Sequence, residues 1–144
     1  MKSRILTFYI KGELFGIDIV LVKEINRNIG YTPIPGAKDN ILGLLNMRGH
    51  VTTIFNISKI LGFGEDLNNL KKSKCIILKP FNLLDDTQIG FLIDKSGDVL
   101  DINKDERERV PANISSIQDE YIESIVKMKD EILIIINPYK MFDG

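Results

Sequence analysis

Residues 40–62 read NILGLLNMRGHVTTIFNISKILG, and this stretch decides the fold. An apolar run from Ile41 to Leu45 stops at the turn formed by residues 46–49. A second run, rich in β-branched residues, extends from Val51 to Ile57. Because β-branched side chains favour a pleated surface, both runs are typical of strands. The stretch therefore predicts a strand, a tight turn, a second strand and a helix cap that ends at Gly62.

The same pattern recurs without a gap 81 residues later, where residues 122–142 align with residues 41–61. The identical pairs are Met47/Met128, Asn56/Asn137 and Lys59/Lys140, and Arg48/Lys129 keeps its charge. A second match, Phe-Gly-Ile-Asp at 15–18 with Phe-Leu-Ile-Asp at 91–94, has an offset of 76. Self-similarity of this kind indicates two β-rich half-units. The alternative is a chance likeness between two hairpins of similar composition.

The composition is that of a globular, mostly β protein. The chain has 144 residues, of which 44% are hydrophobic, and isoleucine is abundant while alanine is scarce. The 19 basic and 20 acidic residues are interspersed and give a net charge of −1, so the positive surface that nucleic acid requires is not expected. No apolar run approaches the roughly 18 residues of a membrane span. We expect a soluble, cytoplasmic protein without direct membrane insertion.

The strands can be placed along the chain from alternation and turn residues. A hairpin is expected over residues 4–18, with Leu6, Phe8 and Ile10 on one face and Ile5 on the other. The segment 19–29 suits either a helix or a strand, and we assign one helical turn followed by a strand. The later strands are expected at 22–28, 41–45, 51–57, 73–79, 87–94 and 99–102. Polar residues 65–72 form the expected connector between the halves, and residues 103–109 a charged turn or loop.

Residue types that carry catalysis or bind cofactors are scarce. His50 is the only histidine and Cys75 the only cysteine, so a metal site built from several such ligands is excluded. We expect His50 in a solvent-facing turn and Cys75 buried in a strand. No glycine-rich phosphate loop occurs, and the aspartates between 85 and 101 lack the spacing of a calcium loop. The sequence therefore predicts neither an enzyme nor a metal or cofactor site.

The order and spacing of several motifs resemble the CheW family of bacterial chemotaxis coupling proteins. The motifs are Leu-Phe-Gly-Ile-Asp-Ile at 14–19, Val-Lys-Glu-Ile at 22–25, Pro-Ile-Pro at 33–35, the whole of 41–57, Gly-Phe-Leu-Ile-Asp at 90–94, and residues 121–137. The resemblance covers nearly the whole chain. Three residues depart from the family pattern, because Thr53, Asn56 and Ser124 stand where proline, aspartate and glycine are usual.

The resemblance implies a fold of two small five-stranded SH3-like β-barrels packed together, with a few short helices. We expect residues 1–144 to form one such domain, with the strands of its two barrels drawn roughly from 4–64 and 73–144. The resemblance also implies a non-catalytic adaptor that couples the cytoplasmic tip of chemoreceptors to the regulatory domain of the histidine kinase CheA. The alternatives are a scaffold of a different receptor and kinase pathway, or a barrel that binds a small ligand.

Because a receptor tip is a helical hairpin, its docking site should be an apolar groove with charges at its rim. The residues placed near this partner-binding site are Val22, Glu24, Ile34, Leu42, Gly43, Arg48 and Gly49. Arg48 suits either a partner contact or an internal salt bridge, and Gly43 either a close backbone approach or a β-bulge. Kinase contacts are not placed by the resemblance, although Ile102, Val110 and Tyr121 are candidates.

Overall fold

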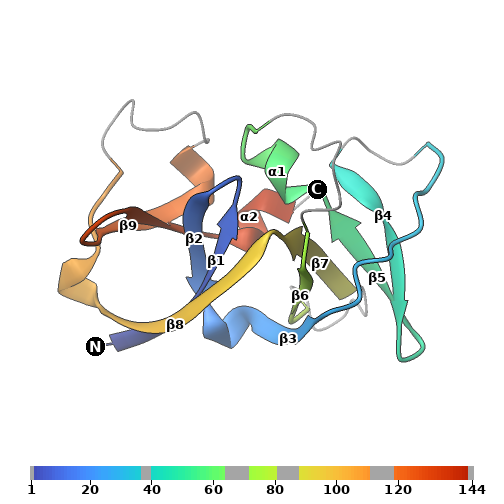
Figure 1. Ribbon diagram of the computed structural model, residues 1–144, viewed down its shortest axis with the longest axis horizontal. Helices are drawn as coiled ribbons and strands as arrows, with labels where there is room; N and C mark the ends of the chain where they lie inside the picture. The colour runs from blue at the N-terminus through green and yellow to red at the C-terminus, as the bar shows by residue number, and fades with distance from the viewer. Residues whose placement is uncertain (1, 37–39, 64–71, 81–87, 111–118, 143–144) are drawn as a thin grey trace.

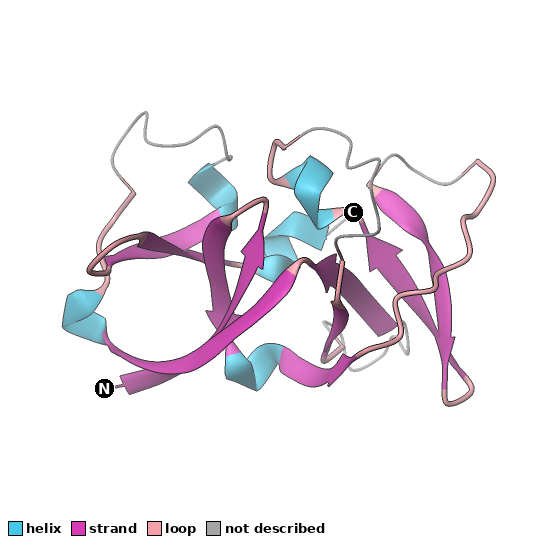
Figure 2. Ribbon diagram, viewed as in Figure 1, coloured by secondary structure: helices cyan, strands magenta, loops and turns pink. Residues whose placement is uncertain are grey.

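The structure of the protein, a computed structural model, describes residues 2–36, 40–63, 72–80, 88–110 and 119–142 (Figure 1). The strands are β1 (Lys2–Ile10), β2 (Glu13–Asp18), β3 (Val22–Asn26), β4 (Ile41–Met47), β5 (His50–Phe55), β6 (Lys74–Leu78), β7 (Gln88–Ile93), β8 (Lys95–Asn103), β9 (Ile122–Lys127) and β10 (Ile132–Ile136). The helices are short: η1 (Ile19–Leu21), α1 (Ile57–Ile60), η3 (Lys104–Glu106), η4 (Asp119–Tyr121) and α2 (Pro138–Phe142). The chain is mostly β, as predicted (Figure 2).

The strands form two five-stranded sheets with the same pairing pattern. Their orders are β8-β1-β2-β10-β9 and β3-β6-β7-β5-β4. In each sheet the central pair is parallel, β10 with β2 and β5 with β7, and the other pairs are antiparallel. The hairpins β4–β5 and β9–β10 hold equivalent places, as do β2 and β7. The two offsets found in the sequence therefore mark a real structural repeat.

Each sheet closes on itself at the same point of the repeat. Beyond β3, Thr32 pairs with Leu44 of β4, and beyond β8, Glu108 pairs with Ile125 of β9. Each bridge has two backbone hydrogen bonds of 2.7–2.9 Å. Since Leu44 and Ile125 are 81 residues apart, these bridges are equivalent. We name the closed sheets barrel A (β1, β2, β8, β9 and β10) and barrel B (β3, β4, β5, β6 and β7).

The expected division of the strands at residues 64 and 73 is wrong. Barrel A takes β1 and β2 from the start of the chain and β8, β9 and β10 from its end, whereas barrel B is continuous from β3 to β7. The chain therefore crosses between the barrels twice, through η1 and at the junction of β7 with β8 (Figure 1). The repeat revealed which hairpins resemble each other, but strand pairing depends on long-range contacts, since β2 finds its parallel partner in β10.

The core lies both inside and between the barrels. In β1, β2, β6 and β7, alternate side chains face opposite ways, and both faces are buried. One set fills the space between the barrels and includes Phe8, Phe15, Ile76 and Phe91. The opposite sets fill barrel A, with Ile5 and Leu133 among its members, and barrel B, with Ile77 and Leu92. The predicted arrangement of Leu6, Phe8 and Ile10 opposite Ile5 is confirmed.

Local boundaries differ from the predictions for identifiable reasons. Strand β3 ends at Asn26 rather than residue 28, because the side chains of Asn26 and Asn28 accept hydrogen bonds from the backbone N–H groups of Asn28 and Gly30. The predicted helical turn is the 3₁₀ turn η1. Strand β8 begins at Lys95 rather than 99. Most of the expected connector 65–72 and the loops at 80–86 and 111–120 lies outside the described residues.

Candidate partner-binding site

The turn at the tip of the β4–β5 hairpin consists of Arg48 and Gly49. Met47 pairs with His50, and both turn residues have positive φ, 51° for Arg48 and 81° for Gly49. This two-residue geometry matches the twist of antiparallel strands and favours glycine. Gly49 is therefore explained by the turn itself, whereas an arginine in the left-handed region is uncommon. His50 is exposed beside this turn, as predicted.

Arg48 forms an ion pair with Glu24, and the pair joins the two edge strands of barrel B. The Arg48 Nη2 to Glu24 Oε2 distance is 3.4 Å; Glu24 lies in β3 and Arg48 directly follows β4, and these two strands lie at opposite ends of the sheet order. The side chain of Arg48 is 77% exposed and that of Glu24 only 20%. The internal salt bridge considered for Arg48 is thus present. The guanidinium of Arg48 nevertheless remains accessible to a partner.

Cys75 of β6 lies completely buried in the core of barrel B. Burial raises the pKa of the Cys75 thiol to about 12, and the negative charge of Glu24 contributes to the increase. The thiol is therefore protonated at neutral pH and unreactive toward metals and oxidants. This agrees with the structural role predicted from the sequence.

The raised pKa of Cys75 predicts a pH dependence of stability. An unfolded thiol ionises above its ordinary pKa of 9.0, whereas the folded thiol stays protonated up to about 12. The contribution of the protonated thiol to the free energy of unfolding is therefore complete below pH 9 and is lost as the pH rises toward 12. Between pH 8 and 10, the stability difference between the wild type and Cys75→Ala should shrink by about 1.4 kcal/mol in urea unfolding. A difference that stays constant over this range would contradict the assignment.

Gly43 permits a close approach of the protein's own backbone. A Cβ atom at this position would collide with the carbonyl oxygen of Thr32 and lie 2.9 Å from a ring carbon of Tyr31. The register of β4 against β5 also shifts between Ile41 and Gly43. The close backbone approach and the irregular strand register, which the sequence left as alternatives for Gly43, therefore occur together. The segment that approaches Gly43 is the one whose bridge to Leu44 closes barrel B.

The other predicted site residues are distributed over barrel B. Ile34, 37% exposed, follows the bridge residue Thr32. Leu42 packs against the core of barrel B, whereas Val22 packs against the core between the barrels. Within the predicted set, the ion pair brings together Glu24 and Arg48, which are distant in the sequence. The structure adds two exposed apolar side chains that the sequence analysis missed, Ile25 at 43% and Val51 at 55%.

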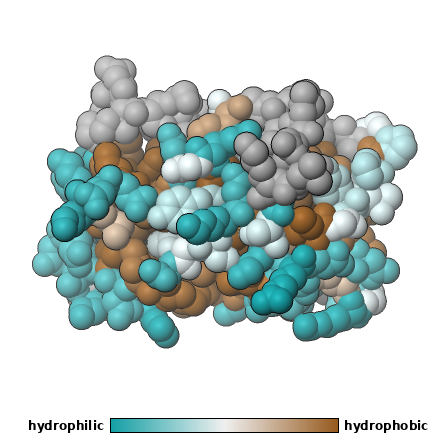
Figure 3. All heavy atoms as spheres, viewed as in Figure 1, coloured by the Kyte–Doolittle hydropathy of each residue, from teal (hydrophilic) through white to brown (hydrophobic). Residues whose placement is uncertain are grey.

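Apolar side chains also reach the surface elsewhere. On the face drawn in Figure 3, hydrophobic surface lies between hydrophilic side chains over both barrels. Val99 and Ile132 of barrel A are 40% and 41% exposed. Alternation of apolar and polar residues separates the two faces of a strand but does not show which face is exposed. The exposure of these side chains therefore depends on how the barrels pack.

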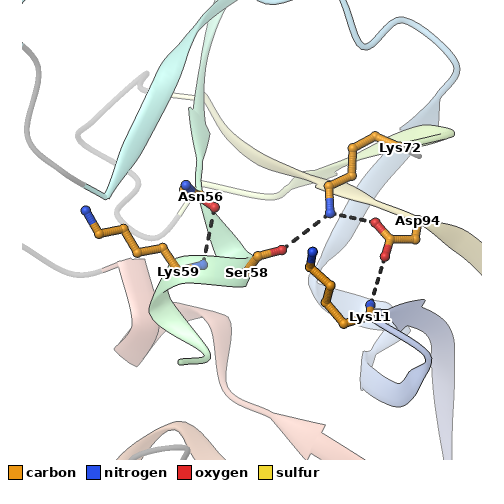
Figure 4. Close-up of polar contacts among 6 residues, drawn as sticks. All are labelled: Lys11, Asn56, Ser58, Lys59, Lys72 and Asp94. Carbon is orange, nitrogen blue, oxygen red and sulfur yellow. Dashed lines mark hydrogen bonds and ion pairs between the residues drawn. The ribbon is translucent and has the colours of Figure 1, made fainter. Parts of the chain in front are cut away.

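A buried polar cluster lies where the β1–β2 turn of barrel A meets the end of β7 in barrel B (Figure 4). Lys72 Nζ lies 2.6 Å from Asp94 Oδ1 and 3.3 Å from Ser58 Oγ of α1. The backbone N–H of Lys11 donates to Asp94 Oδ2 at 2.8 Å. The side chains of Lys72 and Asp94 are only 4% and 18% exposed. The sequence places Lys72 in the polar connector 65–72 and does not predict this cluster.

In the parts of the chain that the structure describes, no group of three or more histidine, cysteine, aspartate or glutamate side chains could hold a metal ion. None of the helices in these parts has the length and apolar character needed to cross a membrane.

Comparison with known proteins identifies the family. The family model described as the CheW-like domain matches residues 4–144. The chain belongs to the CheW-like family. Among its relatives, chemotaxis protein CheW of Treponema pallidum is 30% identical over 99% of this chain and 84% of its own length. Chemotaxis protein CheW of Bacillus subtilis is 28% identical over 98% of this chain and 87% of its own.

The fold of this CheW-like chain is also that of a solved relative. The crystal structure of the scaffolding protein TtCheW from Thermoanaerobacter tengcongensis superimposes with a TM-score of 0.83 at 26% identity, covering all of this chain and 90% of the other. The predicted pair of SH3-like barrels is thereby confirmed. Family membership places the chain among the non-catalytic scaffolds of chemotaxis, as the sequence predicted.

One departure from the CheW pattern, Asn56, can now be explained. Asn56 still caps a helix, because its side-chain oxygen accepts a hydrogen bond of 3.3 Å from the backbone N–H of Lys59 in α1. Its repeat partner Asn137 caps α2 through Tyr139 at 3.1 Å. Ser124, the equivalent of Gly43, is buried, and its hydroxyl has no hydrogen-bond partner among the described residues. Nothing in the structure explains Thr53.

Proposed function

We propose that this chain couples the cytoplasmic tip of chemoreceptors to the histidine kinase CheA by binding both. Its membership of the CheW-like family supports a place in chemotaxis signalling. The observation that carries the proposal is the tip of barrel B, where an exposed guanidinium is held in place by a more buried carboxylate. Holding a charged group in one position reduces the entropy that a partner must remove on binding.

The receptor tip, a helical hairpin, is assigned to barrel B. A helix docks through apolar side chains spaced along one face, and rim charges set its register. Barrel B offers exposed Ile25, Ile34 and Val51, with Arg48 as the charge. Gly43 lies close to the Tyr31–Thr32 segment that precedes Ile34, and Leu42 packs against the core of barrel B.

The regulatory domain of CheA, which resembles this chain in fold, is assigned to the remaining barrel faces. Heterologous contacts between like-folded units build rings or filaments, which suits a scaffold in receptor arrays on the cytoplasmic face of the membrane. The two barrels differ at the repeated turn, since Arg48-Gly49 corresponds to Lys129-Asp130. Such a difference allows the two halves to bind different partners.

The substitution Arg48→Glu tests this assignment. We expect the affinity for a receptor cytoplasmic fragment or for the kinase regulatory domain to fall at least tenfold, because the charge at the rim of the proposed docking surface is reversed. The thermal midpoint should change little, since an ion pair this exposed contributes at most about 1 kcal/mol. Isothermal titration with each partner separately, and calorimetry of the free protein, measure both effects.

Lys127→Glu is the matched control. Lys127 forms a comparable exposed ion pair in barrel A, at 3.7 Å from Glu108, with its side chain 67% exposed. If Arg48→Glu loses affinity for the receptor fragment or for the kinase regulatory domain, Lys127→Glu should still bind that partner like the wild type. A large loss of stability in Arg48→Glu with unchanged affinity for both partners would assign Arg48 a structural role. Failure of the wild type to bind either partner would overturn the adaptor proposal.

A further inference from the structure

A cavity of about 290 Å³ lies on barrel A, away from the proposed receptor surface on barrel B. Strands β1, β2 and β8 and the turn between β9 and β10 form its walls. Leu14, Leu100 and Met128 give it an apolar lining, and Leu14 and Leu100 belong to the core of barrel A. Ligand pockets usually measure about 300–1,000 Å³. This cavity therefore has room for a single side chain or a molecule of similar size.

The polar part of the wall has an acidic character. The hydroxyl of Tyr9 donates a hydrogen bond of 3.2 Å to Glu131, and Asp98 lies in the same wall. Burial, this hydrogen bond and the charges of Glu131 and Asp98 all raise the pKa of Tyr9, so the phenol stays protonated. Within the described part of the chain, neither Asp98 nor Glu131 forms an ion pair. Among the described residues, neither carboxylate is therefore neutralised by an ion pair, although Lys95 lies in the same wall.

A cation already lies against the same wall. Lys95 Nζ lies 5.6 Å from the centre of the Tyr9 ring, a distance at which the ring face attracts a positive charge. Lys95 thus shows how this wall can hold a cation. The wall combines an aromatic face, an apolar surface and nearby carboxylates. With one lysine against two carboxylates, the charged groups of the wall sum to −1.

We propose that this cavity binds an organic cation, a primary ammonium or guanidinium group on a short alkyl stem. The charged group lies against Glu131 and Asp98, and the stem packs on Leu14, Leu100 and Met128. Charge-assisted hydrogen bonds to the carboxylates orient the head, and the apolar lining accepts the methylene groups. The cation is supplied either by a lysine or arginine side chain of another protein or by a free amine. The inference does not depend on the adaptor role.

Titration of the isotope-labelled full chain, followed by NMR, tests the proposal. The probe is N-acetyl-lysine N-methylamide, and its uncharged counterpart is N-acetyl-norleucine N-methylamide. We expect saturable shifts with the lysine probe, confined to residues 95–98 and 128–131 and to Tyr9, and at least tenfold weaker binding of the norleucine probe. Both Glu131→Gln and Asp98→Asn should weaken the lysine probe at least threefold, and the double variant at least tenfold.

The control variant is Glu123→Gln, which removes an exposed carboxylate of β9 outside the cavity and should leave binding unchanged. n-Butylammonium separates the two sources of the cation. Tighter binding of the capped lysine indicates a protein side chain, and equal binding indicates a free amine. The proposal is overturned if neither cation gives saturable shifts, if the norleucine probe binds equally well, or if the double variant binds like the wild type.

Discussion

Replacing Asp94 by asparagine should destabilise the protein by about 3–5 kcal/mol, because it removes a carboxylate that forms an ion pair with a buried lysine. Lys72 Nζ lies 2.6 Å from Asp94 Oδ1, and only 4% of the lysine side chain is exposed. Burying an ammonium group this far from water is costly unless charged and hydrogen-bonding partners compensate it, and Asp94 is one such partner. The thermal midpoint should fall by roughly 10 °C, measured by calorimetry together with urea unfolding.

Two further variants separate the charge effect from other causes. Adding Lys72→Met to Asp94→Asn removes both charges and should restore at least half of the lost stability, because no buried charge remains in the pair. Asp101→Asn disrupts the exposed pair of Arg4 and Asp101, at 3.6 Å with side chains 70% and 60% exposed, and should cost less than about 1 kcal/mol. A loss in Asp94→Asn as small as that of Asp101→Asn would refute the importance of the buried pair.

Phe91→Ala should cost about 3–5 kcal/mol and loosen both barrels, because Phe91 lies in the core that they share. Its ring is completely buried, and its centre lies 5.5 Å from that of Phe8 in barrel A and 5.7 Å from that of Phe142 in α2. A cavity at this point removes contacts on both sides. Hydrogen exchange should therefore accelerate in β1 and β2 as well as in β6 and β7.

The neighbouring residue provides the comparison. Leu92 is equally buried on the same strand, but its side chain belongs to the core of barrel B alone. Leu92→Ala should cost a similar amount, about 2–5 kcal/mol, with accelerated exchange mainly in barrel B. If Phe91→Ala also affected barrel B alone, the two barrels would not be coupled through this shared core.

These two positions also indicate what holds a scaffold of this kind together. The apolar core around Phe91 and the polar cluster around Asp94 both lie where the barrels meet. An adaptor that binds two partners with different faces needs a fixed angle between those faces. The shared core supplies the cohesion, and a charged pair with specific geometry restricts the packing to one arrangement.

The sequence alone determined the local structure of the repeat. Two-residue turns, β-branched runs and capping asparagines act over a few residues, so the hairpins β4–β5 and β9–β10 and the helices after them were predicted from the chain. The alternation in β1 likewise placed Leu6, Phe8 and Ile10 on one face and Ile5 on the other. The motif at 41–57 also carried the family resemblance, which the match over residues 4–144 confirmed.

Only the tertiary structure decided which strands share a barrel and which distant side chains meet. Strand β2 pairs with β10, Glu24 reaches Arg48, Lys72 reaches Asp94, and Tyr9 reaches Glu131 across a separation of 122 residues. The physical reason is that such contacts depend on burial and geometry between segments far apart in the chain, for which local patterns hold no information. The stretch at 40–62 therefore predicted its own hairpin, while the closed barrel around that hairpin placed Arg48 beside Glu24.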